Sequence, residues 1–247
     1  MIEIEKQPVI FRDLGKMEYA QAWNLQETIL QENVQAKGTY YADPNCRNKA
    51  ADLPTQHHLL FVEHPPVYTL GKSGKEAHVL INEEERAAKG ISYFKINRGG
   101  DITFHGPEQL VGYPILDLEK MVTDIGLYLR NLEEVIIRTM AEYGLQGERS
   151  AGETGVWLDP GIPGKERKIC AMGVRCSRWI TMHGFAFNVN TDLHYFDFIV
   201  PCGIQNKQVT SLEKELGRPI PMEEVKEKVK KHFGAVFGIT FIQAESL

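Results

Sequence analysis

Apolar positions recur along the chain with the three- to four-residue spacing of a helix that buries one face. This spacing predicts a first helix from about Lys16, a second from Asp124 to Tyr143, and a last one opened by Pro221. Gly144 follows the second helix and supplies the left-handed residue that commonly ends a helix. The residues expected on the three buried faces are Tyr19, Ala22, Trp23, Leu30 and Val34; Leu129, Leu132, Ile136, Met140 and Tyr143; and Met222, Val225, Val229, Phe233 and Val236.

Shorter apolar runs, bounded by turn-forming residues, predict strands between these helices. They lie at 7–13, 57–63, 67–71, 91–96, 101–104, 110–116, 154–158, 168–175, 184–190 and 239–243. The second and third runs flank the turn at 64–66, which gives a strand, turn, strand pattern. Residues 36–56 have no periodicity and are rich in turn formers, so a surface loop is expected there. The pattern predicts a single α/β (α+β) domain over residues 1–247, in which a mixed β-sheet is flanked by helices.

The composition excludes few functions but narrows the choice of partner. The 247 residues suit one domain, and the hydrophobic share of 43% is ordinary for a soluble globular protein. A net charge of −5 offers nothing that would attract the phosphate backbone of a nucleic acid. One stretch, 165–178, is locally basic. It is either a solvated edge or a docking patch for an acidic protein or a phosphate-bearing arm.

The amino terminus has no basic start followed by an apolar run, so no signal peptide is expected. No stretch approaches the roughly 18 apolar residues of a membrane span. We therefore expect a cytoplasmic protein that does not enter a membrane. In that compartment the cysteines at 46, 170, 176 and 202 are expected to be reduced thiols rather than two disulfides.

The densest group of unusual residues is NRGGDITFHGPEQLVGYPIL at 97–116. Gly99 and Gly100 allow a tight turn whose backbone N–H groups are open to a ligand, and Arg98 places a cation beside them. By themselves the two glycines indicate only a hairpin turn. Because His-Gly-Pro follows immediately, a binding loop is the better interpretation.

Cys202 is the cysteine best placed for chemistry. It lies between a proline and a glycine in IVPCGIQ, where a turn is expected and exposure favours a reactive thiol. Cys170 lies within an apolar strand and is expected to be a small core residue. Two further groups are KICAMG at 168–173 and HGFAFNVN at 183–190. On its position alone, Lys168 would be a charged residue at the edge of a strand.

The sequence does not favour metal or nucleotide chemistry. Cys170 and Cys176 are too far apart for a short zinc clip, and no His-x₃₋₅-His pair follows them. The histidines at 57, 58 and 64 fall on a strand and its turn, which makes them poor candidates for ligands. LGKSGK at 70–75 imitates a phosphate-binding loop with the wrong spacing, and no G-x-G-x-x-G is present. We expect neither a metal ion nor a cofactor.

Taken together, these groups resemble the lipoate biosynthesis octanoyltransferase family, the lipoyl(octanoyl) transferases. RGGDITFHGPEQLVGYP at 98–114 resembles the signature R-G-G-x-x-T-[FYW]-H-G-P-G-Q and its following Tyr-Pro strand. EHPPVYTLG at 63–71 resembles the family's early hairpin. Three further motifs match in the family's order: KICAMG at 168–173, HGFAFNV at 183–189 and PCGI at 201–204. The resemblance spans about residues 8–240. Glu108 departs from it, because the family usually has glycine there, which suits a positive φ or a close approach to substrate.

The resemblance implies a fold similar to the biotin and lipoate protein ligase catalytic domain, and an acyltransferase activity. Cys202 would carry an octanoyl group as a thioester, and Lys168 would be its catalytic partner. The donor would be octanoyl-acyl carrier protein. The acceptor would be a lysine on the lipoyl domains of 2-oxoacid dehydrogenase E2 subunits and on the glycine cleavage H protein, in the first step of endogenous protein lipoylation. The protein would act as a monomer. The acyl pocket would be lined by Arg98, Gly99, Gly100, Asp101, Ile102, Thr103, Phe104, His105, Ala171, Met172, Gly173, Gly184, Phe185 and Ala186.

Thioester chemistry suits these residues and needs no ATP. Exchange of one thioester for another loses little free energy, and formation of an amide from the second thioester is downhill. A free thiol titrates at about 8.5 and a free lysine at about 10.4, so a neighbouring cation is needed to lower the pKa of Cys202. Lys168 would protonate the departing carrier thiol and later deprotonate the attacking amine. Backbone N–H groups at Cys202 and Gly203, or at Met172 and Gly173, would hold the oxyanion.

Several alternatives remain open at this point. His105 and His183 compete with Lys168 as the base, since histidine is the commoner partner of a nucleophilic cysteine, whereas the resemblance favours Lys168. An amidotransferase that moves octanoyl or lipoyl groups between proteins would use the same cysteine. An ATP-dependent ligase would need a nucleotide site and no cysteine at 202. A non-catalytic binding module of the same fold is disfavoured because both Cys202 and Lys168 are present.

Overall fold

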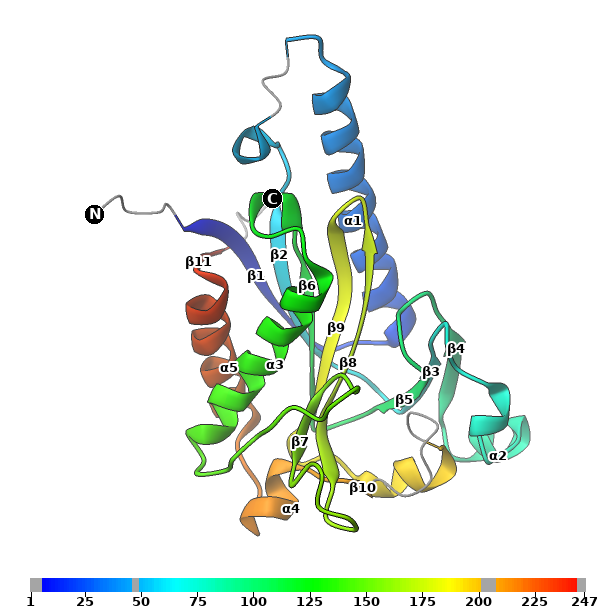
Figure 1. Ribbon diagram of the computed structural model, residues 1–247. Coiled ribbons are helices and arrows are strands. Elements are labelled where there is room, and N and C mark those ends of the chain that lie inside the picture. The colour runs from blue at the N-terminus through cyan, green and yellow to red at the C-terminus, as the bar shows by residue number, and fades with distance from the viewer. Residues whose placement is uncertain (1–5, 46–48, 201–207, 244–247) are drawn as a thin grey trace.

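A mixed β-sheet forms the centre of the computed structural model, which describes residues 6–45, 49–200 and 208–243 (Figure 1). Its strands run in the order β10-β8-β9-β6-β2-β1-β11, and β7 pairs with β8. Strand β1 is parallel to β2 and β11, and β10 is parallel to β8, whereas the other neighbours are antiparallel. The strands are β1 (Gln7–Lys16), β2 (His57–Glu63), β6 (Gln109–Ile115), β7 (Val156–Leu158), β8 (Arg167–Ser177), β9 (Ile180–Asn188), β10 (Gln208–Val209) and β11 (Ile239–Gln243).

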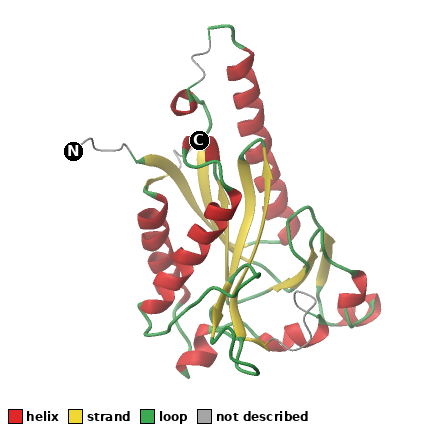
Figure 2. Ribbon diagram, in the orientation of Figure 1, coloured by secondary structure: helices red, strands yellow, loops and turns green. Residues whose placement is uncertain are grey.

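Helices cover both faces of this sheet (Figure 2). The long helices are α1 (Tyr19–Ala42), α3 (Ile125–Ala141) and α5 (Met222–Phe237), and the short ones are α2 (Glu83–Ala88) and α4 (Leu212–Leu216). The 3₁₀ helices are η1 (Ala50–Asp52), η2 (Glu76–His78), η3 (Leu118–Lys120) and η4 (Leu193–Phe198). Helix α1 packs on one face, and α3 and α5 pack on the other. Within the described residues, no helix is long and apolar enough to span a membrane.

Strand β2 shows why the sequence of a central strand contains a continuous run of apolar residues. Its successive side chains point to opposite faces. Leu60 and Val62 belong to the core beneath α1, and Leu59 and Phe61 belong to the core beneath α3 and α5. All four side chains are fully buried. A strand covered on both faces has no position left for a solvated residue, so the polar alternation of a one-sided strand is absent.

The predicted ends of α3 and α5 are confirmed. The Asp124 side chain accepts a hydrogen bond from the backbone N–H of Leu127 (3.0 Å) and caps α3. Gly144 follows α3 with a φ of +74°, and Pro221 directly precedes α5. The start of α1 differs from the prediction, because β1 continues to Lys16, which pairs with Glu63 of β2 beyond an irregularity in the register.

A second, smaller sheet consists of β4 (Ser92–Lys95), β3 (Val67–Leu70) and β5 (Ile102–His105), in that order (Figure 1). The predicted strand, turn, strand pattern at 57–71 is confirmed, but its two strands do not pair as a hairpin. Strand β2 lies in the large sheet and β3 in the small one. The connection contains Pro65 and Pro66, which have no N–H for a ladder hydrogen bond and lead the chain from one sheet to the other.

The surface loop predicted at 36–56 is wrong in its first part, since α1 continues through Ala42. Gly38 weakens a helix there, by about 1 kcal/mol relative to alanine, and tertiary contacts overcome this cost. The Lys37 Nζ donates to Asp117 Oδ1 (2.7 Å) and to the Arg178 carbonyl (2.9 Å). The Tyr41 hydroxyl donates to Glu119 (2.7 Å). These contacts bind the last turns of α1 to η3 and to the β8–β9 turn.

We predict that Lys37→Met lowers the free energy of unfolding by about 3–5 kcal/mol, measured by urea denaturation, because it leaves a buried carboxylate without its cation. Both side chains of this ion pair are buried, with 3% and 0% of their surface exposed. The double variant Lys37→Met/Asp117→Asn should recover part of the loss, since the uncompensated charge is then gone. A loss below about 1 kcal/mol for the single variant would show that this ion pair does not hold the end of α1.

Candidate active site

A cavity of about 680 Å³ lies between the small sheet, strands β6, β8 and β9, and helix α3. It brings together segments that are far apart in the sequence. The predicted pocket residues that line it are Arg98, Gly99, Gly100, Asp101, Ile102, Thr103, His105, Ala171, Met172, Gly173, Gly184, Phe185 and Ala186, and Lys168 lines it as well. The motifs at 98–114, 168–173 and 183–189 therefore converge on one space.

Phe104 is the exception among the predicted pocket residues. Side chains alternate along β5, so Phe104 points away from its neighbours Thr103 and His105, which face the cavity. Its ring stacks on Tyr195 with centroids 4.6 Å apart and meets Phe196 edge-on at 5.5 Å. Phe104 thus belongs to the core of the small sheet and does not line the cavity.

Arg98 lines the cavity and belongs to the turn that joins the two sheets. Its Nη2 donates to the carbonyl (2.6 Å) and the hydroxyl (3.0 Å) of Thr69 on β3, and its Nη1 donates to the Gly99 carbonyl (2.9 Å). The Gly99 N–H donates to the Val174 carbonyl of β8 (3.0 Å). Arg98 is buried, with 7% of its surface exposed. The Arg98–Gly100 turn is therefore bonded to the small sheet on one side and to the large sheet on the other.

Glycine is required where this turn meets its neighbours. A Cβ on Gly71 would lie 2.3 Å from the Gly100 carbonyl oxygen, and one on Gly173 would lie 2.8 Å from the Gly99 carbonyl oxygen. Both separations are well inside van der Waals contact. Gly100 also has a φ of +85°, which a residue with a Cβ rarely adopts. The glycines of the two motifs therefore let the turn approach β8 closely.

Lys168 lies on β8, at the position where β10 pairs with that strand. It pairs with Val209 of β10, and its carbonyl accepts a hydrogen bond from the Thr210 N–H (2.9 Å). Its Nζ lies 4.5 Å from the centre of the Trp157 ring and 3.8 Å from Glu153 Oε2. Lys168 is thus a largely buried cation in the wall of the cavity, not a solvated edge residue.

Cys202 lies outside the described residues, as does Cys46. The chain on either side is anchored. The Val200 N–H donates to the His78 carbonyl (2.8 Å), and Gln208 and Val209 pair with β8. The other two thiols are poorly suited to nucleophilic chemistry. Burial raises the pKa of Cys170, which is fully buried as predicted, and burial also raises the pKa of Cys176.

The histidines that face the cavity are neutral. Burial, together with the nearby His64 and Arg98, holds the pKa of His105 well below its ordinary value. Burial, with Arg98 and Arg175 nearby, lowers the pKa of His183 to about 3. His64 does not line the cavity but bonds to the cavity residue Tyr113, and burial lowers its pKa to about 4. Imidazoles with such pKa values are weak bases at neutral pH.

Three polar side chains from the sequence motifs form a hydrogen-bond network that the motifs did not predict. The His105 Nδ1–H donates to Gln109 Oε1 (3.0 Å), and Gln109 Nε2 donates to Asn188 Oδ1 (2.9 Å). Asn188 Nδ2 donates to the Thr210 carbonyl (2.9 Å). Gln109 and Asn188 also line the cavity. Their only signal in the sequence was their presence within the signature and the HGFAFNV motif. The network connects the small sheet to the chain that follows β10.

Other cavity residues carried weaker signals or none. Leu129 was predicted on the buried face of α3, but nothing indicated that it reaches the cavity. Glu153 follows a turn-rich stretch with no motif. Tyr19 and Tyr113 complete the inner wall, and the Tyr113 hydroxyl donates to His64 Nε2 (2.7 Å). Among the residues that the structure describes, no group of three or more His, Cys, Asp and Glu side chains could hold a metal ion.

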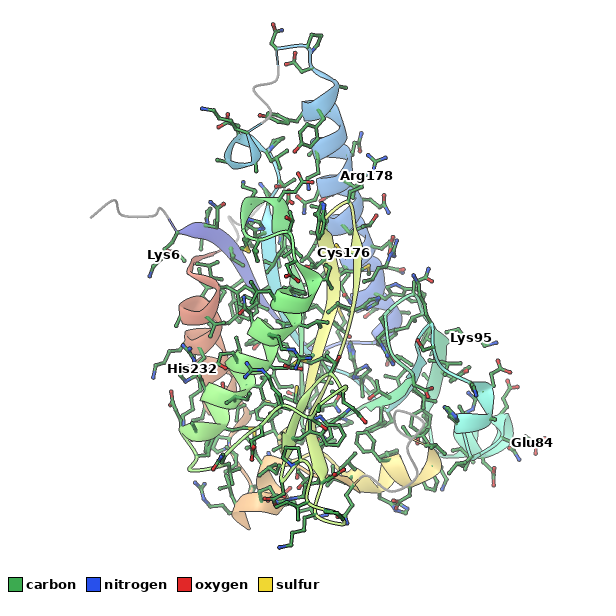
Figure 3. All side chains as sticks on the ribbon, in the orientation of Figure 1. Lys6, Glu84, Lys95, Cys176, Arg178 and His232 are labelled. Atoms are coloured by element: carbon green, nitrogen blue, oxygen red, sulfur yellow. The ribbon has the colours of Figure 1, made fainter. Side chains whose placement is uncertain are left out.

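The locally basic stretch at 165–178 is largely neutralised by its neighbours. Arg167 is bonded to Glu215 (2.6 and 2.7 Å) and to Asp159 (2.5 Å), and Arg175 is bonded to Glu27 (2.8 Å). Cys176 and Arg178 lie toward the end of β8 that is beside α1 (Figure 3). The two paired arginines therefore stabilise the fold, which argues against the docking patch considered from the sequence.

Glu108 has a φ of +60°, the conformation that a glycine at this signature position would adopt freely. Its N–H donates to Glu63 (3.1 Å), its carbonyl accepts from Thr191 (3.0 Å), and its carboxylate accepts from Asn190 Nδ2 (2.8 Å). These bonds hold a backbone conformation that costs a residue with a Cβ about 1–2 kcal/mol.

Comparison with known proteins identifies relatives over nearly the whole chain. The family model of the lipoyl protein ligase A/B catalytic domain matches residues 18–234. The octanoyltransferase of Christiangramia forsetii is 58% identical over 227 residues, which are 92% of this chain and 94% of that protein. The octanoyltransferase of Cytophaga hutchinsonii is 50% identical over 229 residues, which are 93% of this chain and 92% of that protein.

The fold is also found among solved structures. The bi-partite lipoate protein ligase of Thermoplasma acidophilum has a TM-score of 0.66 and 16% identity, over 97% of this chain and 86% of its own. Lipoate-protein ligase A bound with ATP has a TM-score of 0.67 and 14% identity, over 97% of this chain and 89% of its own. The expected lipoate ligase fold is thus confirmed.

We predict that Glu108→Gly changes the free energy of unfolding by less than about 1 kcal/mol, because relief of the left-handed backbone offsets the loss of one exposed hydrogen bond. Glu108→Val should destabilise the protein by about 1–2 kcal/mol or more, since a β-branched residue is poorly tolerated at positive φ. Thermal denaturation of both variants measures the difference. A valine variant as stable as the wild type would contradict the positive φ.

The neutral histidines predict acid sensitivity. Because their pKa values are lowered on folding, the unfolded chain takes up more protons below about pH 6.5, so the free energy of unfolding falls as the pH falls. The expected slope between pH 6.5 and 4.5 is up to about 1.4 kcal/mol per pH unit for each such histidine. His64→Gln should reduce the slope in urea denaturation by about one such contribution. Identical slopes for variant and wild type would refute the assignment of His64.

Proposed function

This chain belongs to the lipoyl protein ligase A/B catalytic-domain family, and from that premise we propose how it transfers an octanoyl group. Its curated octanoyltransferase relatives share 46–58% identity with it over most of its length. It is accordingly an octanoyltransferase that acts in protein lipoylation. The proposal concerns the residues: Cys202 carries the octanoyl group as a thioester, and Lys168 moves the protons.

The observation that carries the proposal is the place of Lys168. Its side chain is in the wall of the cavity, and its backbone pairs with Val209 of β10. The segment that contains Cys202 enters β10 at Gln208. Gln208 and Val209, which follow the segment that contains Cys202, therefore pair with the strand that carries Lys168. A cation beside a thiol lowers the pKa of that thiol and makes it a better nucleophile.

Two half-reactions follow from this pair. In the first, the Cys202 thiolate attacks the donor thioester, the new C–S bond forms as the old one breaks, and Lys168 gives its proton to the departing carrier thiolate. In the second, the acceptor amine attacks the acyl-cysteine and Lys168, now neutral, takes up a proton. The energy of the amide comes from the donor thioester, so no nucleotide takes part in either step.

The pKa values of the neighbouring histidines support Lys168 as the base. His183, with a pKa of about 3, and His105, whose pKa is also lowered, would accept a proton only weakly at neutral pH. Lysine can cycle between ammonium and amine when a thiolate or an amine lies beside it. The alternative of a histidine base is therefore disfavoured on physical grounds.

The cavity suits a medium-length acyl chain. Ile125 and Leu129 of α3, with Met172 and Phe185 of the large sheet, give it apolar walls. Burying an aliphatic chain there contributes about 0.8 kcal/mol for each methylene removed from water. We assign the acyl-binding role to this cavity and, among the residues named from the sequence, to all except Phe104.

The partners follow from the same activity. The donor we propose is octanoyl-acyl carrier protein, and the acceptors are lipoyl domains of 2-oxoacid dehydrogenase E2 subunits and the glycine cleavage H protein. A thioester donor brings its own activation, and a lysine acceptor gives a stable amide. We further propose that the protein acts as a monomer in the cytoplasm.

Intact-mass spectrometry after mixing with octanoyl-acyl carrier protein tests the acyl-enzyme. We expect an adduct of one octanoyl group on the wild type and none on Cys202→Ser, because the serine hydroxyl is a poor nucleophile at neutral pH. Cys176→Ser serves as the matched control and should form the adduct at the wild-type rate. The absence of an adduct on the wild type would sink the acyl-enzyme mechanism.

Substitution of the candidate bases tests the proton carrier. Lys168→Ala should slow octanoyl transfer by about 10²–10⁴-fold, which is the usual contribution of general acid–base catalysis. His105→Ala and His183→Ala should slow it less and leave the shape of the pH–rate profile unchanged. Transfer that survives the loss of Lys168 but not of a histidine would reassign the base.

A further inference from the structure

A carboxylate stands beside the proposed catalytic lysine. Two acidic side chains line the cavity in the described part of the chain, Asp101 and Glu153. Asp101 is engaged by His78 Nδ1 (2.5 Å) and by the Ile102 N–H (2.7 Å). Glu153 Oε2 lies 3.8 Å from Lys168 Nζ, and 15% of its side-chain surface is exposed. Glu153 therefore lies beside Lys168 in the cavity wall, with a partly exposed side chain.

Contacts of Gly155 and of Glu153 itself fix the backbone of the loop that contains Glu153. Gly155, two residues after Glu153, has a φ of +118°, and a Cβ there would lie 2.5 Å from the Cys170 carbonyl oxygen, so only glycine fits. The Gly155 N–H donates to the Glu133 carboxylate (3.0 Å), which is fully buried and also bonded to Arg149 (3.1 Å). The Glu153 N–H donates to the Ser150 carbonyl (3.2 Å). The carboxylate is therefore presented to the cavity by a fixed loop.

The Trp157 ring also contacts the side chain of Lys168. Its ring centre lies 4.5 Å from Lys168 Nζ, and the two residues are paired across β7 and β8. With the ring on one side and a carboxylate on another, Lys168 Nζ has a defined place in the cavity wall. A second amine that enters the cavity near this nitrogen also comes near Glu153.

The acceptor lysine presents an electrostatic problem that Glu153 can solve. It arrives as an ammonium ion after Lys168 has become neutral, and the cavity still contains the cation Arg98, which repels it. A carboxylate at this place attracts the ammonium and brings it within proton-transfer reach of Lys168. We propose that Glu153 is the binding residue for the ammonium group of the acceptor lysine, a role that rests on the proposed function above.

The proton balance of this step is complete. After acylation, Lys168 is a neutral amine. The acceptor ammonium docks on Glu153 and gives one proton to Lys168, and the freed amine attacks the thioester carbonyl of acylated Cys202. The C–N bond forms as the C–S bond breaks, Cys202 departs as a thiolate, and the second proton passes from the nitrogen to solvent. Lys168 ends as an ammonium ion, ready to protonate the next carrier thiolate.

Separate measurement of the two half-reactions of Glu153→Gln tests the proposal. Acylation of Cys202 by octanoyl-acyl carrier protein is followed by intact mass. Transfer to an unmodified E2 lipoyl domain is followed from the preformed acyl-enzyme. Transfer to hydroxylamine, which is uncharged at neutral pH, is the third readout. We expect acylation and hydroxylamine transfer within about threefold of wild type, and transfer to the lipoyl domain reduced by about 10- to 100-fold, the usual worth of a hydrogen bond to a charged group.

Two companion variants keep the result interpretable. Glu153→Asp retains the charge and should recover part of the transfer to the lipoyl domain. Glu148→Gln removes an exposed acidic residue that lies nearby in the sequence and does not line the cavity, and it should transfer at the wild-type rate. Equal transfer by Glu153→Gln and wild type would overturn the proposal. So would an equal loss in all three readouts, because Glu153 would then only position Lys168. A wild type that forms no adduct would instead refute the acyl-enzyme itself.

Discussion

The close approach of the Arg98–Gly100 turn to strand β8 is the constraint on which the site depends. A single hydrogen bond from the Gly99 N–H to Val174 fixes the turn to the large sheet, while Arg98 fixes it to Thr69 in the small sheet. The approach is possible only because glycines stand at the contact points, where a Cβ would collide with a carbonyl oxygen. Two separate sheets are thereby held at one distance, and the cavity is the space left between them.

The side chains that line this cavity differ in charge. His64, His105 and His183 are neutral because burial removes them from water, and His105 bonds to Gln109 while His64 bonds to Met17 and Tyr113. His105 and His183 line the cavity as polar but uncharged side chains. Lys168 keeps a carboxylate and an aromatic face beside it. Among the described cavity residues, the proposed proton carrier Lys168 therefore differs in its surroundings from the neutral histidines.

The fold by itself does not decide the reaction. Lipoate-protein ligase A, solved with ATP bound, superposes on nearly the whole chain at a TM-score of 0.67. The difference lies in side chains. A cysteine between a proline and a glycine, a lysine in the KICAMG motif and the absence of a nucleotide motif from the sequence point to transfer from an activated donor rather than activation by ATP. Relatives at up to 58% identity, named octanoyltransferases, agree with that interpretation.

The sequence by itself determined most of the strands and helices, the cavity motifs and the candidate pair, because periodicity and short motifs are properties of contiguous residues. The tertiary structure decided what depends on residues far apart in the chain. It separated β2 from β3 into two sheets, extended α1 through the contact of Lys37 with Asp117, and turned Phe104 away from the cavity. It also brought Glu153 to Lys168 and buried the histidines enough to lower their pKa values. Burial and the distance between charges are set by packing, and no local pattern encodes them.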